Sequence, residues 1–116
     1  MTNEKAAQSA AEEWLSFVDA GDYAKSWTES AVGFKRVIDQ PGWEKALNGG
    51  RAPLGKVLSR TLKSATYSTT LPGAPDGQYV VIQFNVSFEK KQTAIETVTP
   101  AKEADGHWRV SGYYIR

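Results

Sequence analysis

His107 is the only histidine in the sequence, and the chain contains no cysteine. A Ser-His-Asp triad could therefore form only around His107, while thiolate catalysis, CxxC redox chemistry and cysteine zinc sites are excluded. His107 follows Asp105-Gly106, a pair that is typical of a turn. The sequence favours a solvent-exposed turn histidine over a catalytic base.

The spacings that commonly bind metals or phosphates are absent. The sequence has no HExxH and no EF-hand pattern, so a metal site would need most of its ligands from scattered carboxylates. The glycine-rich pieces GGRAPLGK and PGAPDG do not match the GxxxxGK[ST] or GxGxxG patterns that hold phosphates. We therefore predict no metal and no cofactor.

Glu96 has the most scope for acid–base chemistry, because a carboxylate inside an apolar cavity can act as an acid or a base. In QTAIETVTP, Ala94, Glu96 and Val98 share one face of a predicted strand. Ile95 lies on the other face. If Ala94 and Val98 point inward, Glu96 enters the interior; if Ile95 does, Glu96 pairs with a basic residue at the surface. The rarity of buried carboxylates favours the surface alternative.

Six aromatic side chains could wall an apolar pocket, namely Trp14, Tyr23, Trp27, Trp43, Trp108 and Tyr114. Their helical or strand spacing also explains each one as a core residue, and both interpretations stay open. A sheet with a strong twist often leaves a gap at one end of the helices that cover it. The predicted ligand-binding residues are Trp14, Trp27, Phe84, Glu96 and Tyr114.

Helices are predicted in the N-terminal half of the chain, where they would position Trp14 and Trp27. From Asn3 to Ala20, apolar residues recur at helical spacing, and Gly21 ends the pattern. Asp22 can cap a second helix and Asp39 a third. Asn48-Gly49-Gly50 is expected to weaken the end of the third helix.

Strands are predicted in the rest of the chain, where apolar residues alternate. YVVIQFNVSF is the clearest strand, preceded by RTLKSATYSTTL and followed by QTAIETVTPAKE and HWRVSGYYIR. In the last strand, alternation assigns Val110 and Tyr114 to the core, and Tyr113 and Ile115 to the outer face. The pattern predicts an α+β fold, with N-terminal helices packed on one face of a four-stranded antiparallel meander.

The composition is that of one globular domain covering residues 1–116. The net charge is +1, and the 14 Lys and Arg residues are spread along the chain, so no nucleic-acid partner is predicted. No apolar run is long enough to predict a membrane span, and MTNEKAAQSAAEE lacks the basic and apolar regions of a signal peptide.

Four of the segments that carry a family resemblance are EEWLSFVDAGDYAKSW, LPGAPDGQYVVIQF, ETVTP and DGHWRVSGYYIR. They resemble the bacterial domain-of-unknown-function 4019 family, and the resemblance covers about residues 10 to 116. It implies the cystatin-like cone of the nuclear transport factor 2-like superfamily, and a periplasmic or secreted location. It carries no catalytic residues over to this sequence.

Three functions follow from these observations, in order of preference. The first is a non-enzymatic module that binds an unidentified small molecule in an apolar pocket between helices and sheet. The second is an interaction domain, a possible homodimer that pairs through Tyr79, Val81, Tyr113 and Ile115 on the outer sheet face. The third is an isomerase-like or hydratase-like enzyme that uses Glu96.

Overall fold

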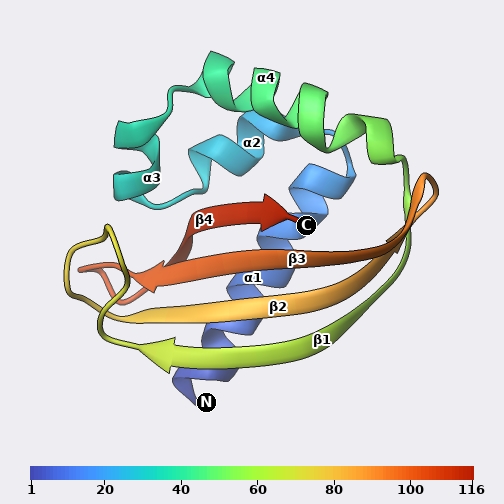
Figure 1. Cartoon of the computed structure of the whole chain (residues 1–116). Coiled ribbons are helices and arrows are strands. Elements are labelled where there is room, and N and C mark those ends of the chain that lie inside the picture. The colour runs from blue at the N-terminus through green and yellow to red at the C-terminus, as the bar shows by residue number, and fades with distance from the viewer.

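The computed structural model describes all 116 residues and has four α-helices followed by four strands (Figure 1). The helices are α1 (Asn3–Asp19), α2 (Tyr23–Thr28), α3 (Val32–Val37) and α4 (Gln40–Gly50), and a 3-10 turn spans Ala52–Leu54. The strands β1 (Val57–Ser68), β2 (Tyr79–Phe88), β3 (Lys91–Lys102) and β4 (Trp108–Ile115) form one antiparallel sheet in chain order. The predicted α+β fold is confirmed.

The helices begin at the predicted capping residues. The Asp22 and Asp39 side chains accept hydrogen bonds from backbone N–H groups of the first turns of α2 and α4, and Thr2 does the same for α1. A cap of this kind contributes about 1 kcal/mol. Gly21 ends α1 with a φ of 78°, a conformation that glycine adopts without strain.

The region between α2 and α4 differs from the prediction. The second helix ends at Thr28, and the unpredicted helix α3 follows it. α3 has no side-chain cap and no buried residue, so its own sequence gives little signal. The chain before it is held by the Ala31 N–H, which donates to the Val110 carbonyl of β4 at 2.8 Å. α4 stays helical through Gly49 and Gly50, one turn after its buried anchor Leu47.

The core lies between α1 and the face of the sheet that α1 crosses, here called the inner face (Figure 1). The predicted inward set of β2 is confirmed, because Val80, Ile82, Phe84, Val86 and Phe88 are all buried. Helices α2, α3 and α4 lie beyond β4, at one side of the sheet (Figure 1). None of the four helices combines the length and apolar character that crossing a membrane requires.

The opposite face of the sheet, here called the outer face, is polar but uncharged over its two central strands. Alternation and pairing register place nine residues there: Tyr79, Val81, Gln83, Asn85 and Ser87 of β2, and Ile95, Thr97, Thr99 and Ala101 of β3. Tyr79 is nevertheless buried near the β1–β2 loop, where its hydroxyl donates to the Pro75 carbonyl at 2.6 Å.

Candidate functional site

The predicted space between α1 and the sheet is filled by side chains. Trp14 and Phe84 are only 3% and 2% exposed and belong to the hydrophobic core. Trp27 packs against that core, and its indole N–H donates to the Ile38 carbonyl at 2.9 Å. These three residues do not enclose a common cavity, so their role in binding a ligand stays a prediction.

Two buried serines satisfy the tryptophan N–H groups of this core. The Trp14 indole N–H donates to the Ser26 carbonyl at 2.8 Å and lies 3.1 Å from the Ser30 hydroxyl. The Trp43 indole N–H donates to the Ser26 hydroxyl at 2.9 Å. The sequence analysis missed both serines, although their spacing of four places them on one helical side and buried indoles need acceptors. This arrangement ties α1 and α4 to α2.

A β-bulge at Ser111 reverses the predicted sides of the two C-terminal tyrosines. Pro100 pairs with Val110, but its neighbour Thr99 pairs with Gly112, which leaves Ser111 as an extra residue in β4. An extra residue inverts the alternation beyond it. Tyr113 therefore packs inward, and Tyr114 is 54% exposed on the outer face, which corrects the assignment of both. Pro100, which has no N–H for a ladder bond, was the available signal.

Glu96 lies on the inner face and is completely buried, so the favoured surface alternative was wrong. Its carboxylate is compensated by two partners on other strands. The Arg60 Nε–H donates to Glu96 Oε1 at 2.8 Å, and the Tyr113 hydroxyl donates to Oε2. Sequence reasoning could not find these partners, because Arg60 is 36 residues away and the bulge conceals Tyr113.

The partners of Glu96 extend into a larger group that we call the Glu96 cluster, formed by Asp19, Arg51, Arg60, Glu96 and Tyr113. Arg60 makes two hydrogen bonds to Asp19, at 2.7 and 3.1 Å. Arg51 reaches Asp19 at 3.3 Å, and its guanidinium stacks on the Phe88 ring at 4.7 Å. The two guanidinium groups balance the two carboxylates, which is how buried charges are normally tolerated.

Contacts within the Glu96 cluster shift the pKa values of Arg60 and Tyr113. Burial alone would lower the pKa of Arg60, but hydrogen bonds and charges from Asp19 and Glu96 outweigh burial and raise it. Burial raises the pKa of Tyr113, and the negative charge of Glu96 raises it further. Tyr113 therefore keeps its proton and donates it to Glu96 in a hydrogen bond. Since Glu96 has no exposed surface, the cluster stabilises the packing of α1 on the sheet.

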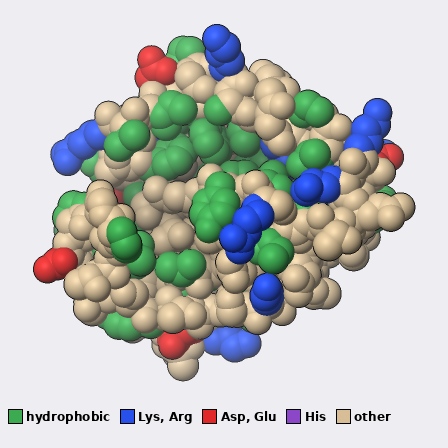
Figure 2. Space-filling model, viewed as in Figure 1, with side chains coloured by type: hydrophobic (Ala, Val, Ile, Leu, Met, Phe, Trp, Pro, Cys, Tyr) green, Lys and Arg blue, Asp and Glu red, His purple; other side chains and the backbone are tan.

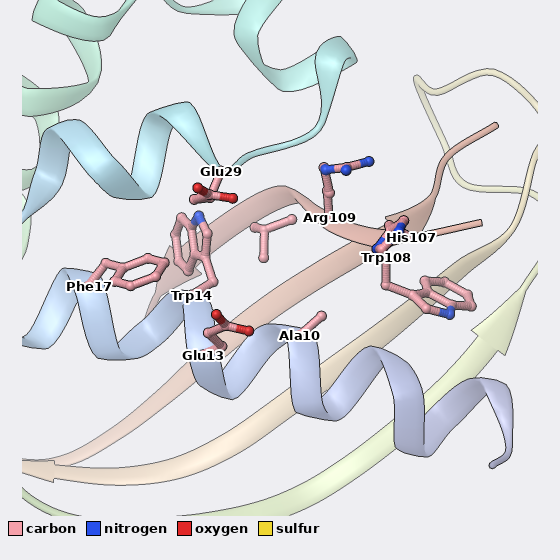
Figure 3. Close-up of a pocket in the computed structure, with 9 residues that line it drawn as sticks. Ala10, Glu13, Trp14, Phe17, Glu29, His107, Trp108 and Arg109 are labelled. Carbon is pink, nitrogen blue, oxygen red and sulfur yellow. The ribbon is translucent and has the colours of Figure 1, made fainter. Parts of the chain in front are cut away.

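A small cleft lies between α1 and the beginning of β4 (Figure 3). Trp14, Glu13 and Glu29 gather at one end of it, while His107 lies at the other on the β4 side. Its volume of about 170 Å³ is below the range of typical ligand sites. His107 is exposed, as its position after a turn predicted. This cleft is therefore a weak candidate for a ligand site.

Asp105, in the turn before His107, is involved in an ion pair of its own. A hydrogen bond from Arg109, followed by one from the His107 backbone N–H, lowers the pKa of Asp105 to about 2. Arg109 also donates to Glu103 at 2.8 Å. Asp105 and Glu103 are thus both paired with Arg109. His107 contacts Asp105 through its backbone N–H and not through its ring, so the hydrogen bonds of a triad are not formed.

A second small cleft lies between α4 and the end of β4. Its volume is about 210 Å³, and Trp43, Leu47, Arg51 and Tyr114 are among the residues that line it. This is the one cleft of the three described here that includes Tyr114. It brings Tyr114 together with none of the other four predicted ligand-binding residues.

A third cleft, here called the α3 cleft, is much larger, at about 600 Å³. It opens on the outer face beneath the upper helices, where Figure 2 shows a hollow flanked by hydrophobic side chains. Residues of β3 and β4 form its floor, and α3 and the β1–β2 loop form its walls. The lining residues are Ala31, Gly33, Phe34, Val37, Ile38, Leu71, Pro72, Gly73, Ala74, Pro75, Tyr79, Thr99, Ala101, Glu103, Ser111, Gly112 and Tyr113.

The α3 cleft holds one charged side chain, and that side chain already has partners. Glu103 accepts hydrogen bonds from the Val32 backbone N–H at 2.9 Å and from Arg109 at 2.8 Å. The rest of the lining is apolar, aromatic, glycine or hydroxyl-bearing. None of the five predicted ligand-binding residues is among them, because α3 and the bulge at Ser111, which shape the cleft, were both unforeseen.

Residues 10–113 match the family described as "Protein of unknown function (DUF4019)". The chain belongs to the DUF4019 family. No curated protein matches it. The matched region of this DUF4019 domain contains every residue of the Glu96 cluster and of the α3 cleft, so both features lie within the family's part of the chain. Tyr114 falls just outside the matched region.

Proposed function

We propose that this DUF4019 domain binds a small, uncharged and largely apolar ligand in the α3 cleft. One observation carries the proposal: a cleft of about 600 Å³ whose single charged side chain, Glu103, is already paired. That volume lies within the 300–1,000 Å³ of typical small-molecule sites, which are mainly apolar with a few polar groups. A charged ligand would lose hydration there without gaining a free counter-charge.

Exposed apolar groups on the cleft wall support the same proposal. Val37 is 87% exposed, and Phe34 and Leu71 are only partly buried. Covering a side chain of this size fully is worth about 1.5–3 kcal/mol, which a ligand in the cleft would gain in part. Thr99 and Ser111, which also line the cleft, provide a small number of polar groups for a ligand.

Gly33 and Gly49 give a matched test of the cleft. A Cβ atom at either position would meet no atom within 4 Å, and both lie in helices, but only Gly33 lines the cleft. Gly33→Leu should fill the cleft, while Gly49→Leu should change the helix in a similar way and leave the cleft open. Either change should favour the helix by up to about 1 kcal/mol.

Titration with the neutral fluorophore N-phenyl-1-naphthylamine would measure the result. Wild type and Gly49→Leu should give saturable fluorescence enhancement with similar Kd, and Gly33→Leu should weaken binding by at least about tenfold, equivalent to 1.4 kcal/mol. Equal binding by Gly33→Leu and wild type, with both folded by circular dichroism, would overturn the α3 cleft as the site.

The outer-face homodimer stays a prediction, with a different surface from the one expected. Tyr79 is buried, and Tyr113 and Ile115 pack toward the core, so the four-residue patch does not exist as predicted. A homodimer would have to use the uncharged residues around Val81 instead. Sedimentation equilibrium distinguishes the two proposals, because ligand binding in the cleft requires no self-association.

We also propose that the fold is a variant of the nuclear transport factor 2-like cone. Support comes from the long α1 across one face of the sheet and the remaining helices beyond β4 (Figure 1). An experimental structure compared with known members of the superfamily would test this relationship. The periplasmic or secreted location implied by the resemblance is likewise a proposal, and cell fractionation would test it.

A further inference from the structure

The strands that form the floor of the α3 cleft continue toward Tyr114 on the outer face. Thr99 and Gly112 are paired across β3 and β4, and both line the cleft. The next outer-face pair on the same strands is Thr97 and Tyr114. Two residues along a strand span about 7 Å. A ligand that extends from the cleft along β4 therefore reaches Tyr114 at once.

Tyr114 ends a row of polar side chains that crosses the sheet. The register aligns Ser64 with Gln83, Gln83 with Thr97, and Thr97 with Tyr114, one residue from each strand. The Gln83 amide approaches the Thr97 hydroxyl at a long 3.4 Å, and the Tyr114 ring is 54% exposed. Thr97 is only 3% exposed, so the groups that the row presents at the surface are the partly exposed Gln83 amide and the Tyr114 ring.

Gly112 leaves room for a ligand next to that ring. A Cβ atom at Gly112 would meet only the Thr99 Cβ, at 3.8 Å, so no side chain stands between the cleft and Tyr114 on β4. A hydroxyl-rich ring could therefore lie on Tyr114 while its hydroxyls reach the Gln83 amide. Stacking on an aromatic ring and hydrogen bonds to amide and hydroxyl groups are suited to sugar-like headgroups.

The distribution of charge favours an uncharged headgroup. None of the nine outer-face residues of β2 and β3 is charged. The Glu103–Arg109 pair lies at the cleft end of the face and is already satisfied. Arg116, whose backbone pairs with Ile95, is the next outer-face residue after Tyr114 and lies about 7 Å further along the strand. The row from Ser64 to Tyr114 contains no charged residue of its own.

We infer that the ligand is an uncharged amphiphile, with its apolar chain in the α3 cleft and a hydroxyl-rich headgroup over Tyr114 and Gln83. This inference rests on the proposed function and adds the chemical class of the ligand. It assigns Tyr114 as the stacking platform for the headgroup. The Gln83 amide supplies its hydrogen bonds.

Four short probes test this inference, because they differ in whether they carry the alkyl chain, the sugar headgroup or both. Octyl β-D-glucoside, used below its micelle concentration, carries both parts; 1-octanol carries the chain with a single hydroxyl; methyl β-D-glucoside carries the sugar alone; octyl sulfate carries an anionic headgroup. Each would compete with N-phenyl-1-naphthylamine in a displacement titration. The glucoside should bind at least about tenfold more tightly than each of the other three.

Variants test whether the difference in affinity between octyl glucoside and octanol arises at the headgroup site. Tyr114→Ala and Gln83→Ala should each bring octyl glucoside close to the affinity of octanol and leave octanol itself unchanged. Gln92→Ala, exposed at the beginning of β3, is the control and should change neither. Gly33→Leu should weaken glucoside and octanol together, because it fills the shared cleft.

The outcomes separate the inference from the proposed function. Equal affinity for glucoside and octanol, or unchanged glucoside binding by Tyr114→Ala, would overturn the headgroup site and leave the apolar cleft standing. Tightest binding of octyl sulfate would replace the uncharged headgroup by an anionic one near Arg116. Failure of every alkyl probe to displace the fluorophore from the folded protein would overturn the proposed function itself.

Discussion

Tyr113 and Tyr114 are adjacent in the sequence and have opposite surroundings. Tyr113 packs edge-on against Trp14, with ring centroids 5.1 Å apart, and donates its hydroxyl proton to Glu96. Tyr114 has half of its surface exposed. Removing one hydroxyl oxygen from each residue therefore compares a buried hydrogen bond with an exposed group in the same strand.

Tyr113→Phe should lower the free energy of unfolding by about 1–3 kcal/mol, because one oxygen of the buried Glu96 carboxylate loses its donor. Tyr114→Phe should stay within about 0.5 kcal/mol of wild type. Urea unfolding at neutral pH, followed by tryptophan fluorescence, measures both values. A Tyr113→Phe variant as stable as Tyr114→Phe would show that the hydroxyl contributes nothing to stability.

Alkaline pH should reveal the raised pKa of Tyr113. A tyrosine in the unfolded chain ionises near pH 10, and Tyr113 ionises at a higher pH in the folded protein. Its contribution to stability is therefore complete below pH ~10 and is lost as pH rises above that value, by about 1.4 kcal/mol per pH unit. The stability difference between wild type and Tyr113→Phe should shrink accordingly in urea titrations between neutral and strongly alkaline pH.

Arg60 is the single cation in direct contact with Glu96. Arg60→Met should cost about 3–5 kcal/mol, because it leaves a buried carboxylate without its counter-charge. Arg109→Met is the control, since its carboxylate partners are more exposed and its loss should shift the urea midpoint far less. Equal midpoints for the two variants would contradict a stabilising role for the Glu96 cluster.

At the scale of elements, the bulge in β4 decides which aromatic residues face the core. Ser111 has no partner across the ladder, and its hydroxyl donates to the Thr99 carbonyl at 2.8 Å. The bulge also lies beside Pro100, which has no N–H to offer. One extra residue thus directs Tyr113 to Glu96 and leaves Tyr114 on the outer face.

Deletion of Ser111 should leave Tyr113 inward and Tyr114 outward, because Gly112 would then follow Val110 directly and still pair with Thr99 in a regular ladder. Ser111→Ala keeps the register and should cost about 1 kcal/mol for the lost hydrogen bond. Near-ultraviolet circular dichroism during thermal unfolding should show a native aromatic signal and a sharp transition for both variants. Loss of that signal in the deletion variant would show that the sides of the two tyrosines depend on the bulge itself.

The elements with regular periodicity were predictable, and the irregular ones were not. The spacing of apolar residues predicted α1 and β2 and the side of each that is buried, because each has one dominant buried face. Helix α3 has no buried residue and no cap, so no local pattern marks it. Glu96 illustrates the remaining difficulty, since its burial depends on Arg60 and Tyr113 in other strands. The α3 cleft depends on these irregular parts and was missed with them.

At the scale of the whole molecule, the core and the α3 cleft differ in how firmly they are built. The core holds α1 against all four strands, whereas α3 buries none of its residues and meets the sheet at one end of the cleft. The opposite wall is the β1–β2 loop, which contains two prolines and two glycines between Leu71 and Gly77. The proposed site thus has walls with few buried residues on a floor of paired strands.

Hydrogen exchange should report this difference. Amides of α3 and of residues 69–78 should exchange much faster than those of β2 and β3, because α3 has no buried residue and neither segment has ladder partners on both sides. Saturating octyl β-D-glucoside should slow exchange in both walls together. Protection confined to one wall, or found only in the core, would be inconsistent with a ligand between α3 and the loop.

The Glu96 cluster also has a consequence for the order of folding. Its hydrogen bonds join residues that are 41, 36 and 17 positions apart, so they cannot form until α1, β1, β3 and β4 have assembled. Contacts that form after the rate-limiting step influence how fast the native state opens and have little effect on how fast it is reached. Arg60 should therefore determine the lifetime of the folded protein, and its replacement should accelerate unfolding while the folding rate stays nearly unchanged.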